Sequence, residues 1–302
     1  MFGGEMFGAY LGQAMALLTA LAWALAVIMF RRSGESVHPI GLNLFKDFLA
    51  ISLLIPTLYL FGETLFRPAP ARDYAIMLIS GAIGIGVSDT LFFKSLNVLG
   101  AGRVAIVDCL YSPAVIGLSM LWLGESLTLW QVIGSVMIIS AVLTALVERE
   151  SDNGYTKKQI AVGILLGALA QIGNGVGIVL VKPVLNDAPL IWVTTWRLVG
   201  GFASLLLLLP LLKNRGRIIG SIFSRQRWGY TLGGSFLGAY LAMILWLAGM
   251  KFTQASIAAV LNQTSNIFIF IFAALMLREK ITPPRLLGIV LGVGGALIVT
   301  FL

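Results

Sequence analysis

Cysteine and histidine, the side chains that build disulfide bonds and most zinc sites, are almost absent from the sequence. The 302 residues include one cysteine and one histidine. A single cysteine cannot form a disulfide bond within the chain, and Cys109 with His38 is too small a set for a zinc site of the usual kind. We therefore expect no disulfide framework, no metal site and no cofactor.

Charged residues are also scarce, and this scarcity decides the class of protein. They make up 11% of the chain, whereas soluble domains carry about 25%. Hydrophobic residues make up 58%, and the mean hydropathy is +0.94. A soluble fold of this size would have too little polar surface to cover itself. The composition therefore predicts a polytopic membrane protein.

The net charge of +8 is compatible with this class. Lys and Arg in membrane proteins collect in cytoplasmic loops, and no basic domain lies outside the apolar segments. We therefore expect no nucleic-acid partner.

The first residues, MFGGEMFGAY, lack the basic start and the small-residue cleavage site of a secretory signal, so we expect the first helix to be retained.

Long apolar runs fill most of the sequence. A membrane-spanning helix needs about 20 mostly apolar residues, whereas the strands of a membrane barrel alternate over about ten residues. The unbroken runs favour helices, and we predict an all-α polytopic membrane protein with ten transmembrane helices. The ten segments are residues 8–29, 40–61, 74–95, 102–123, 128–147, 160–181, 190–212, 229–250, 255–277 and 284–302.

The distribution of basic residues predicts the orientation in the membrane. Loops after the odd-numbered segments hold fifteen Lys and Arg residues, and loops after the even-numbered segments hold four, namely Arg67, Arg72, Lys182 and Lys251. The positive-inside rule places the first set in the cytoplasm, so both termini should face outward.

One basic loop, residues 213–228, has isoleucines at helical spacing between its charges, which predicts a short interfacial helix.

The sequence repeats itself at an offset of 154 residues. GESLT (124–128) then aligns with REKIT (278–282), and the same offset serves the second to fifth and the seventh to tenth segments without a gap. The first repeat covers residues 1–150 and the second covers 151–302. Each has five helices, an odd number, so the second copy is inverted in the membrane. Inverted repeats are typical of secondary transporters with a substrate site near the bilayer midplane.

Ten helices in two five-helix repeats, each with a G/R-E-x-x-T motif, resemble the drug/metabolite transporter superfamily and its EamA-type members. More narrowly, the chain resembles bacterial aromatic amino acid exporters of the YddG type. The resemblance implies the bacterial inner membrane and a central cavity lined by helices 3, 4, 8 and 9, with help from 1 and 6. Helices 2 and 7 are then peripheral, so Lys46 and Arg197 are expected to be structural.

Two polar helix faces are the strongest candidates for a substrate site. Asp108, Tyr111 and Ser112 share one face of the fourth segment, and the repeat offset places Asn262, Ser265 and Asn266 on the matching face of the ninth. Gln263 adds an amide beside them. These groups suit a zwitterionic or otherwise polar solute, although the amides alone are equally explained by hydrogen bonds between helices. A buried carboxylate is more costly, which favours a function for Asp108 in binding an amine or a proton, or in pairing with Lys94 or Arg103.

Other candidates are weaker. They are Asp89, Lys94, Gln171, Asn174, Trp23 and Tyr240 for substrate binding, and Pro113, Gly84 and Gly238 for gating. The two motif glutamates, Glu125 and Glu279, are expected to be structural and to accept hydrogen bonds from backbone donors at a helix start or from the other repeat.

A membrane enzyme is excluded by missing motifs. The sequence has no H-E-x-x-H, no G-x-G-D and no membrane-embedded Ser–His pair, and no nucleotide-binding loop for ATP-driven pumping. We therefore predict a secondary transporter that exports small metabolites, most of all aromatic or hydrophobic amino acids, with protons as a candidate coupling ion and the lipid bilayer as surroundings. Drugs, nucleosides or sugar-like solutes stay as alternatives, as does a non-transporting membrane subunit.

Overall fold

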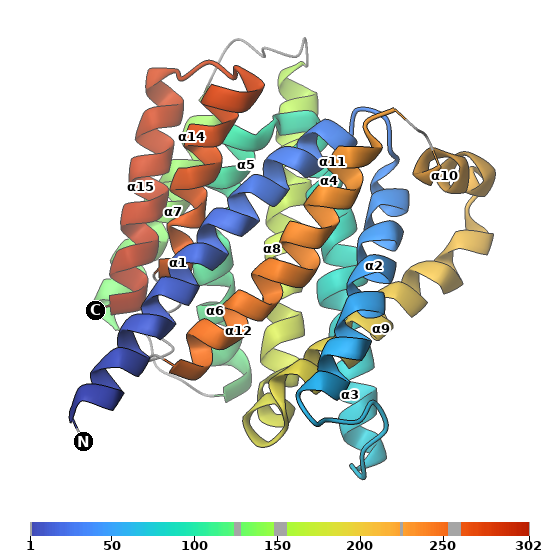
Figure 1. Ribbon diagram of the computed structural model, residues 1–302. Coiled ribbons are helices and arrows are strands. Elements are labelled where there is room, and N and C mark those ends of the chain that lie inside the picture. The colour runs from blue at the N-terminus through green and yellow to red at the C-terminus, as the bar shows by residue number, and fades with distance from the viewer. Residues whose placement is uncertain (1, 124–127, 148–155, 224–225, 253–260, 302) are drawn as a thin grey trace.

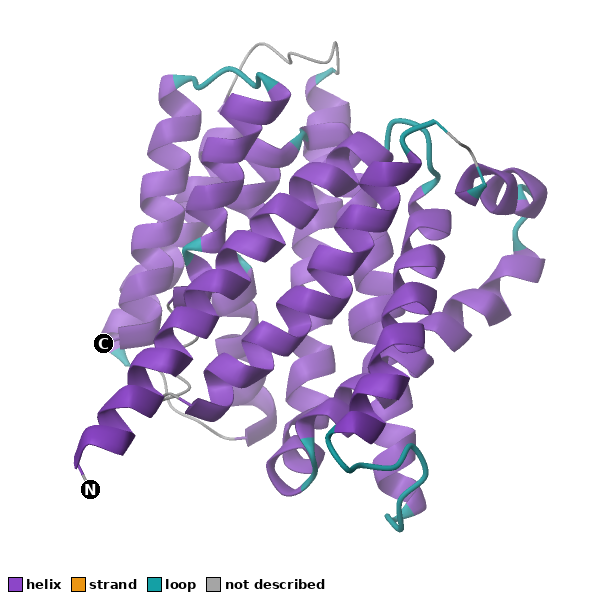
Figure 2. Ribbon diagram, viewed as in Figure 1, coloured by secondary structure: helices purple, strands orange, loops and turns teal. Residues whose placement is uncertain are grey.

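Figures 1 and 2 show a computed structural model of the chain, which describes residues 2–123, 128–147, 156–223, 226–252 and 261–301. Helices make up nearly all of these described residues, and none of them forms a strand. The prediction of an all-α membrane fold is confirmed.

The ten predicted spans correspond to the helices of the structure. Five spans contain one helix each: α1 (Phe2–Ser33), α2 (Pro39–Leu60), α7 (Leu129–Val147), α8 (Lys157–Asp187) and α15 (Pro283–Phe301). The third span is α3 (Ala71–Gly81), η1 (Ala82–Val87) and α4 (Ser88–Leu99), and the fourth is α5 (Ala101–Asp108) and α6 (Tyr111–Leu123). The seventh is α9 (Leu190–Leu208) and η2 (Leu209–Leu211), the eighth is α11 (Trp228–Ser235), η3 (Phe236–Leu241) and α12 (Ala242–Phe252), and α14 (Ser265–Leu277) belongs to the ninth.

The lengths and compositions of these helices suit a bilayer. Six helical runs within the described residues are long and apolar enough to cross a membrane, and shorter apolar helices cover Val132–Thr144, Leu261–Leu277 and Pro283–Ile298. Large apolar side chains are exposed around the bundle, with Leu121 86% and Leu207 78% exposed. Such an apolar surface is typical of a protein that faces lipid.

The spans are interrupted at positions that match the repeat. η1 and η3 are π-helical turns that begin at Ala82 and Phe236, 154 residues apart. α6 and α14 begin at Tyr111 and Ser265, again 154 residues apart. The offset found in the sequence therefore also relates the irregular backbone of the two halves.

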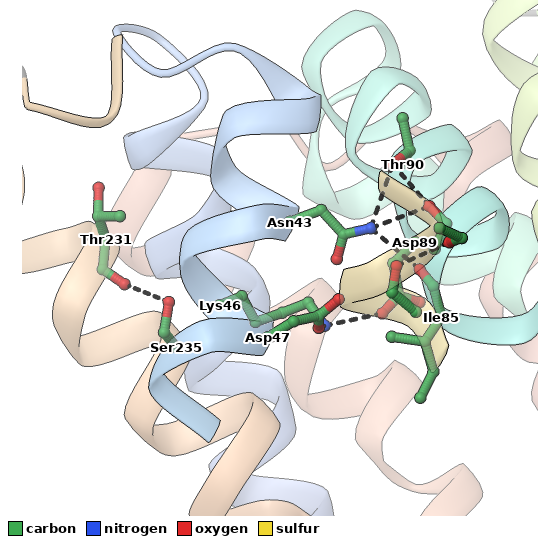
Figure 3. Close-up of polar contacts among 11 residues, drawn as sticks. Asn43, Lys46, Asp47, Ile85, Asp89, Thr90, Thr231 and Ser235 are labelled. Carbon is green, nitrogen blue, oxygen red and sulfur yellow. Dashed lines mark hydrogen bonds and ion pairs between the residues drawn. The ribbon is translucent and has the colours of Figure 1, made fainter. Parts of the chain in front are cut away.

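One side chain explains how the π-helical turn η1 is tolerated. A π-helical turn departs from the regular α-helical hydrogen-bond ladder and often marks a functional site. The Asn43 amide of α2 donates to the carbonyl oxygens of Ile85 and Gly86, at 2.9 and 3.0 Å, and to Oγ1 of Thr90 at 3.1 Å (Figure 3). The amide therefore holds the second span against the irregular part of the third.

Glycines bring particular pairs of spans close together. A Cβ at Gly81 would lie 1.8 Å from the carbonyl oxygen of Arg197, and one at Gly177 would lie 2.9 Å from that of Ser80. In the second half, a Cβ at Gly238 would lie 2.9 Å from the Ala26 side chain. The third span therefore packs backbone to backbone against the seventh and sixth, whereas Gly238 of the eighth span packs closely against side chains of the first.

The basic loop contains the predicted short helix. α10 (Arg215–Ile222) lies at one edge of the bundle, at the end that also carries the loop between α14 and α15 (Figure 1). Ile218 of α10 is buried in a cluster with Ile40, Leu44 and Leu205, whereas Phe223 is 75% exposed. The existence of this helix is confirmed, and its place at the lipid–water interface stays a prediction.

Trp192, near the start of α9, is covered by a loop. Its side chain is only 1% exposed. Its Nε1 donates to the carbonyl oxygen of Leu65 at 2.9 Å, and the guanidinium of Arg67 lies 5.4 Å from its ring centre. The loop between α2 and α3 folds over the indole, which a sequence alone does not reveal.

Candidate solute-binding cavity

A cavity of about 280 Å³ lies among the helices. This volume is close to the lower end of small-molecule sites, which begin at about 300 Å³. Its lining residues come from spans one to four and six to nine: Thr19, Trp23, Lys46, Gly84, Ile85, Asp89, Phe92, Asp108, Tyr111, Gln171, Asn174, Ile178, Arg197, Leu198, Gly238, Ala239, Ala242, Met243, Trp246, Asn262, Gln263, Ser265 and Asn266. Most of the predicted site residues are therefore brought together.

Asp108 lies at the division of the fourth span, where α5 ends and the chain turns before α6. Its Oδ1 accepts a hydrogen bond of 2.5 Å from Nε2 of Gln171 on α8. The carboxyl group also lies at the C-terminal end of α5, where the helix dipole disfavours a negative charge and favours a positive one. The structure thus presents a carboxyl group whose partner is a neutral amide, rather than Lys94 or Arg103.

The two predicted polar faces contact each other. Nε2 of Gln263 donates to Oγ of Ser112 at 2.6 Å, and Nδ2 of Asn266 donates to Oε1 of Gln263 at 3.3 Å. Nδ2 of Asn266 also approaches Sγ of Cys109 at 3.5 Å. Asn262, Gln263 and Asn266 line the cavity, whereas Ser112 lies behind them as a partner of Gln263. The face from the ninth span therefore both borders the cavity and joins it to the fourth.

An ionic cluster forms one wall of the cavity. Nζ of Lys46 lies 2.5 Å from Oδ1 of Asp47 and 3.0 Å from Oδ2 of Asp89. Figure 3 shows these side chains meeting between α2 and α4. The Asp47 side chain is 0% exposed, whereas the Asp89 side chain is 23% exposed. We expected Lys46 to be peripheral, but its charge reaches the cavity and is shared between a buried carboxylate and one that faces the open space.

Arg197 also reaches the cavity from a span that we expected to be peripheral. Its Nε donates to Oγ of Ser80 at 3.0 Å, and Ser80 in turn donates to the carbonyl oxygen of Gly177 at 2.6 Å. Gly81 allows the backbone of α9 to press directly on α3, which carries the side chain inward. The sequence signal for this approach is the set of glycines at 81, 200 and 201, whose missing side chains let the two helices meet.

The remaining predicted site residues divide into those at the cavity and those elsewhere. Asn174, Trp23, Gly84 and Gly238 line it, and the Trp23 ring lies 6.2 Å from that of Phe92. Tyr240 does not line it, because its hydroxyl forms a 2.8 Å hydrogen bond with Thr57.

Two further predicted residues, Lys94 and Pro113, do not line the cavity. Lys94 is exposed near the middle of α4 and does not line the cavity, since that helix turns this side chain outward. Pro113 does not kink a continuous helix: it lies in the first turn of α6, after the chain has already turned at residues 109–110. A proline is tolerated in a first turn because its missing N–H has no helical partner there.

Glu279, one of the two motif glutamates, has the structural role that the sequence predicted. Its Oε1 and Oε2 accept hydrogen bonds from the backbone N–H groups of Ala101 and Gly102, at 2.8 and 3.0 Å. A carboxylate from the second half therefore caps the N-terminus of α5 in the first half, where the helix dipole favours it. Glu125 lies outside the described residues.

A bundle of membrane-spanning helices around a cavity with charges of both signs defines a polytopic membrane transporter. The family model that matches the sequence is that of the EamA-like transporter family, and it matches residues 10–147 and 161–301. The chain therefore belongs to the EamA-like transporter family, as the sequence resemblance predicted.

Individual relatives agree with this assignment. The chain is 22% identical to an uncharacterized transporter of Archaeoglobus fulgidus over 91% of this chain and 92% of the relative. It is 27% identical to the uncharacterized transporter YxxF of Bacillus subtilis over 47% of this chain, and this match spans only 44% of that relative. A solved crystal structure with 16% sequence identity aligns with a TM-score of 0.65 over 96% of both chains, which shows a shared fold.

Proposed function

We propose that the protein is a secondary transporter that exports amino acids, above all aromatic or hydrophobic ones, by alternating access around the central cavity. One observation carries the proposal: the cavity is lined at once by cationic groups on Lys46 and Arg197, by carboxyl groups on Asp89 and Asp108, and by aromatic rings. A zwitterion with an apolar side chain is complementary to such a lining. Exporters of the YddG type, which the sequence resembles, share this substrate class.

The two halves support the alternating-access part of the proposal. Their irregular segments recur at the 154-residue offset, and the family model matches each half separately. Two inverted five-helix repeats, residues 1–150 and 151–302, could exchange conformations to give an outward-open and an inward-open state of similar energy. The cell membrane of a bacterium, with both termini outward, is the location that we propose.

Asp108 is the candidate for coupling to protons. Its carboxyl group lies at the negative end of α5, and its hydrogen-bond partner among the described residues is the neutral amide of Gln171. A proton or a substrate ammonium at this carboxyl would remove an unfavourable charge from the interior of the bundle. We propose that the two cations compete for it, so that one leaves as the other binds.

Transport by purified protein in proteoliposomes tests the function. Labelled amino acids, nucleosides, sugars and cationic drugs are offered with and without a pH gradient. We expect aromatic and hydrophobic amino acids to move and the gradient to change their rate. Movement of other solutes alone would contradict the amino-acid proposal, and movement of no solute would contradict transport itself.

The variant Asp108→Asn tests the coupling role. It should lower the rate about tenfold or more, the effect of losing one hydrogen bond to a charged group, and should abolish the response to the pH gradient. The matched control is Asp187→Asn, because Asp187 is exposed at the C-terminal end of α8. A wild-type pH response in Asp108→Asn would remove Asp108 from the mechanism.

A further inference from the structure

We infer that Arg197 binds the carboxylate of the transported solute and thereby selects solutes that carry a carboxylate. The inference rests on the proposed function and concerns the same cavity, but it assigns the anion-binding position to a residue of the seventh span. The family resemblance treats that span as peripheral.

Arg197 borders the cavity, and its terminal guanidinium nitrogens have no hydrogen-bond partner within the described part of the chain. Its Nε is bound to Ser80, which leaves the two terminal nitrogens. Among the described residues, no carboxylate oxygen lies within 4.0 Å of them, and the cavity runs along this side chain. A partly buried cation without a contacting anion is costly inside a membrane protein, so these donors mark a position for an anionic group.

The second cationic group of the cavity is already occupied. Lys46 contacts the carboxylates of Asp47 and Asp89, at 2.5 and 3.0 Å. A solute carboxylate near Lys46 would have to displace one of them and would be repelled by the other. Arg197 offers in addition a planar pair of donors, which matches the two oxygens of a carboxylate better than an ammonium does.

The surroundings of Arg197 hold it in place and leave room beside it. Ser80 and the carbonyl oxygen of Gly177 fix the Nε side of the guanidinium. On the other side, a Cβ at Gly84 would lie 3.5 Å from Nη2 of Arg197 and 3.9 Å from Oδ1 of Asn174. The missing side chain of Gly84 therefore leaves room beside the guanidinium, next to the Asn174 amide, and both residues line the cavity.

The opposite charges lie on other elements of the same cavity. Asp89 is on α4 and Asp108 is at the end of α5, and both line the cavity with Arg197 of α9. A solute ammonium would be attracted to these carboxyl groups while its carboxylate binds Arg197. Such a solute adds no net charge to the bundle, whereas an amine or an anion alone would add one.

Binding of matched acids and amides tests the inference. The probes are phenylalanine and leucine, their amides, which lack the carboxylate, and 3-phenylpropanoate, which lacks the amine. They are titrated against the purified full-length protein in detergent by isothermal calorimetry. Wild-type protein should bind each amino acid about 10- to 100-fold more tightly than its amide, the effect of a hydrogen bond to a charged group.

The variant Arg197→Gln should remove this preference, so that acid and amide bind within about threefold of each other, with unchanged affinity for the amide. Arg197→Lys should keep part of the preference, because the charge stays but the planar donor pair is lost. Ser80→Ala, which removes the Nε partner, should also weaken it. The control Arg72→Gln changes an exposed arginine outside the cavity and should leave the preference intact.

The outcomes separate the two proposals. Wild-type protein that binds amides or amines as well as acids would overturn the role of Arg197, and transport of those solutes would leave the transporter itself standing. The role of Arg197 would also be overturned if Arg197→Gln kept the full preference for acids over amides. If Arg197→Gln does not fold, the same conclusion would follow from an undiminished preference in Arg197→Lys and Ser80→Ala. Failure of every solute to move in proteoliposomes would instead contradict the proposed function.

Discussion

Asp47 has an unusual position for a carboxylate. Its side chain is 0% exposed, its Oδ1 contacts Lys46, and its Oδ2 has no hydrogen-bond partner among the described residues. Burial of a charge is tolerated only when a partner compensates it. Lys46 is therefore needed for folding as well as for the charge pattern of the cavity, and this requirement can be measured as a change in stability.

Removal of Lys46 alone should be more harmful than removal of the pair. Lys46→Met leaves a buried carboxylate without its cation, which costs about 3–5 kcal/mol. The double variant Lys46→Met/Asp47→Leu should recover most of this loss, because no buried charge remains at position 47. Thermal unfolding in detergent, followed by tryptophan fluorescence, measures the stability of the single and of the double variant. Equal melting temperatures for the single and double variants would show that the ion pair does not stabilise the fold.

His38 titrates outside the membrane-spanning segments, at the start of α2. Burial lowers the pKa of its imidazole below the usual value of about 6.5, and the charge of Lys94 lowers this pKa further. In its neutral form, Nδ1 accepts a hydrogen bond from the backbone N–H of Ile40 at 3.2 Å and caps the helix. Because the unfolded chain binds the proton more readily, the contribution of His38 to stability is lost as the pH falls below about 6.5.

The variant Lys94→Gln should raise the pKa of His38 toward the usual value. The chain has one histidine, so NMR of labelled protein in micelles reports this titration without assignment. Lys157→Gln, at the start of α8, is the matched control and should not move the pKa. The same pKa in Lys94→Gln and wild type would mean that Lys94 does not act on His38.

At the scale of elements, α5 depends on a residue from the other half of the chain. The Glu279 carboxylate accepts from two N–H groups at the start of this helix. Gly100, with φ of 79°, forms the one-residue connection that lets α5 begin directly after α4. The cap and the glycine together place Asp108 at the far end of α5, so a structural contact also positions the candidate site.

Loss of the Glu279 cap should destabilise the fold by about 1–2 kcal/mol, the usual range for a helix cap. Glu279→Ala removes both acceptors, whereas Glu279→Gln keeps one oxygen and should lose less. The melting temperatures of the two variants, measured by thermal unfolding, show which of them loses more stability. If Glu279→Ala is as stable as wild type, the contact adds nothing to the energy of the fold.

The elements differ in how far their sequence predicts them. Apolar runs of about 20 residues identify the spans, because burial in lipid imposes that composition. The π-helical turns carry no such signal, since the amide that holds η1, Asn43, comes from another span. Arg197 was missed for the same reason: its place in the cavity depends on contact between α3 and α9 at Gly81, not on its own helix.

At the scale of the whole molecule, the fifth and tenth spans pack together outside the cavity lining. A Cβ at Gly295 of α15 would lie 2.6 Å from the carbonyl oxygen of Gly134 of α7, so the two backbones are in direct contact. The other eight spans supply the described lining. We therefore expect α7 and α15 to form a constant contact between the halves, around which the remaining spans rearrange during transport.

The basic residues predict the orientation of the molecule in the membrane. The end of the bundle that carries α10 and the α14–α15 loop holds most of them, whereas both termini lie toward the opposite end (Figure 1). The positive-inside rule assigns the basic end to the cytoplasm. Two exposed phenylalanines lie on the two sides: Phe66 in the α2–α3 loop, 74% exposed, and Phe223 after α10, 75% exposed.

Labelling of single cysteines in intact cells tests this orientation. Cys109 is 0% exposed and its replacement by alanine gives a cysteine-free background. In that background, Phe66→Cys should react with a membrane-impermeant maleimide in intact cells, and Phe223→Cys should react only after the membrane is permeabilised. The reverse pattern would invert the topology. It would also place α10 outside the cell, where its basic residues would no longer obey the positive-inside rule.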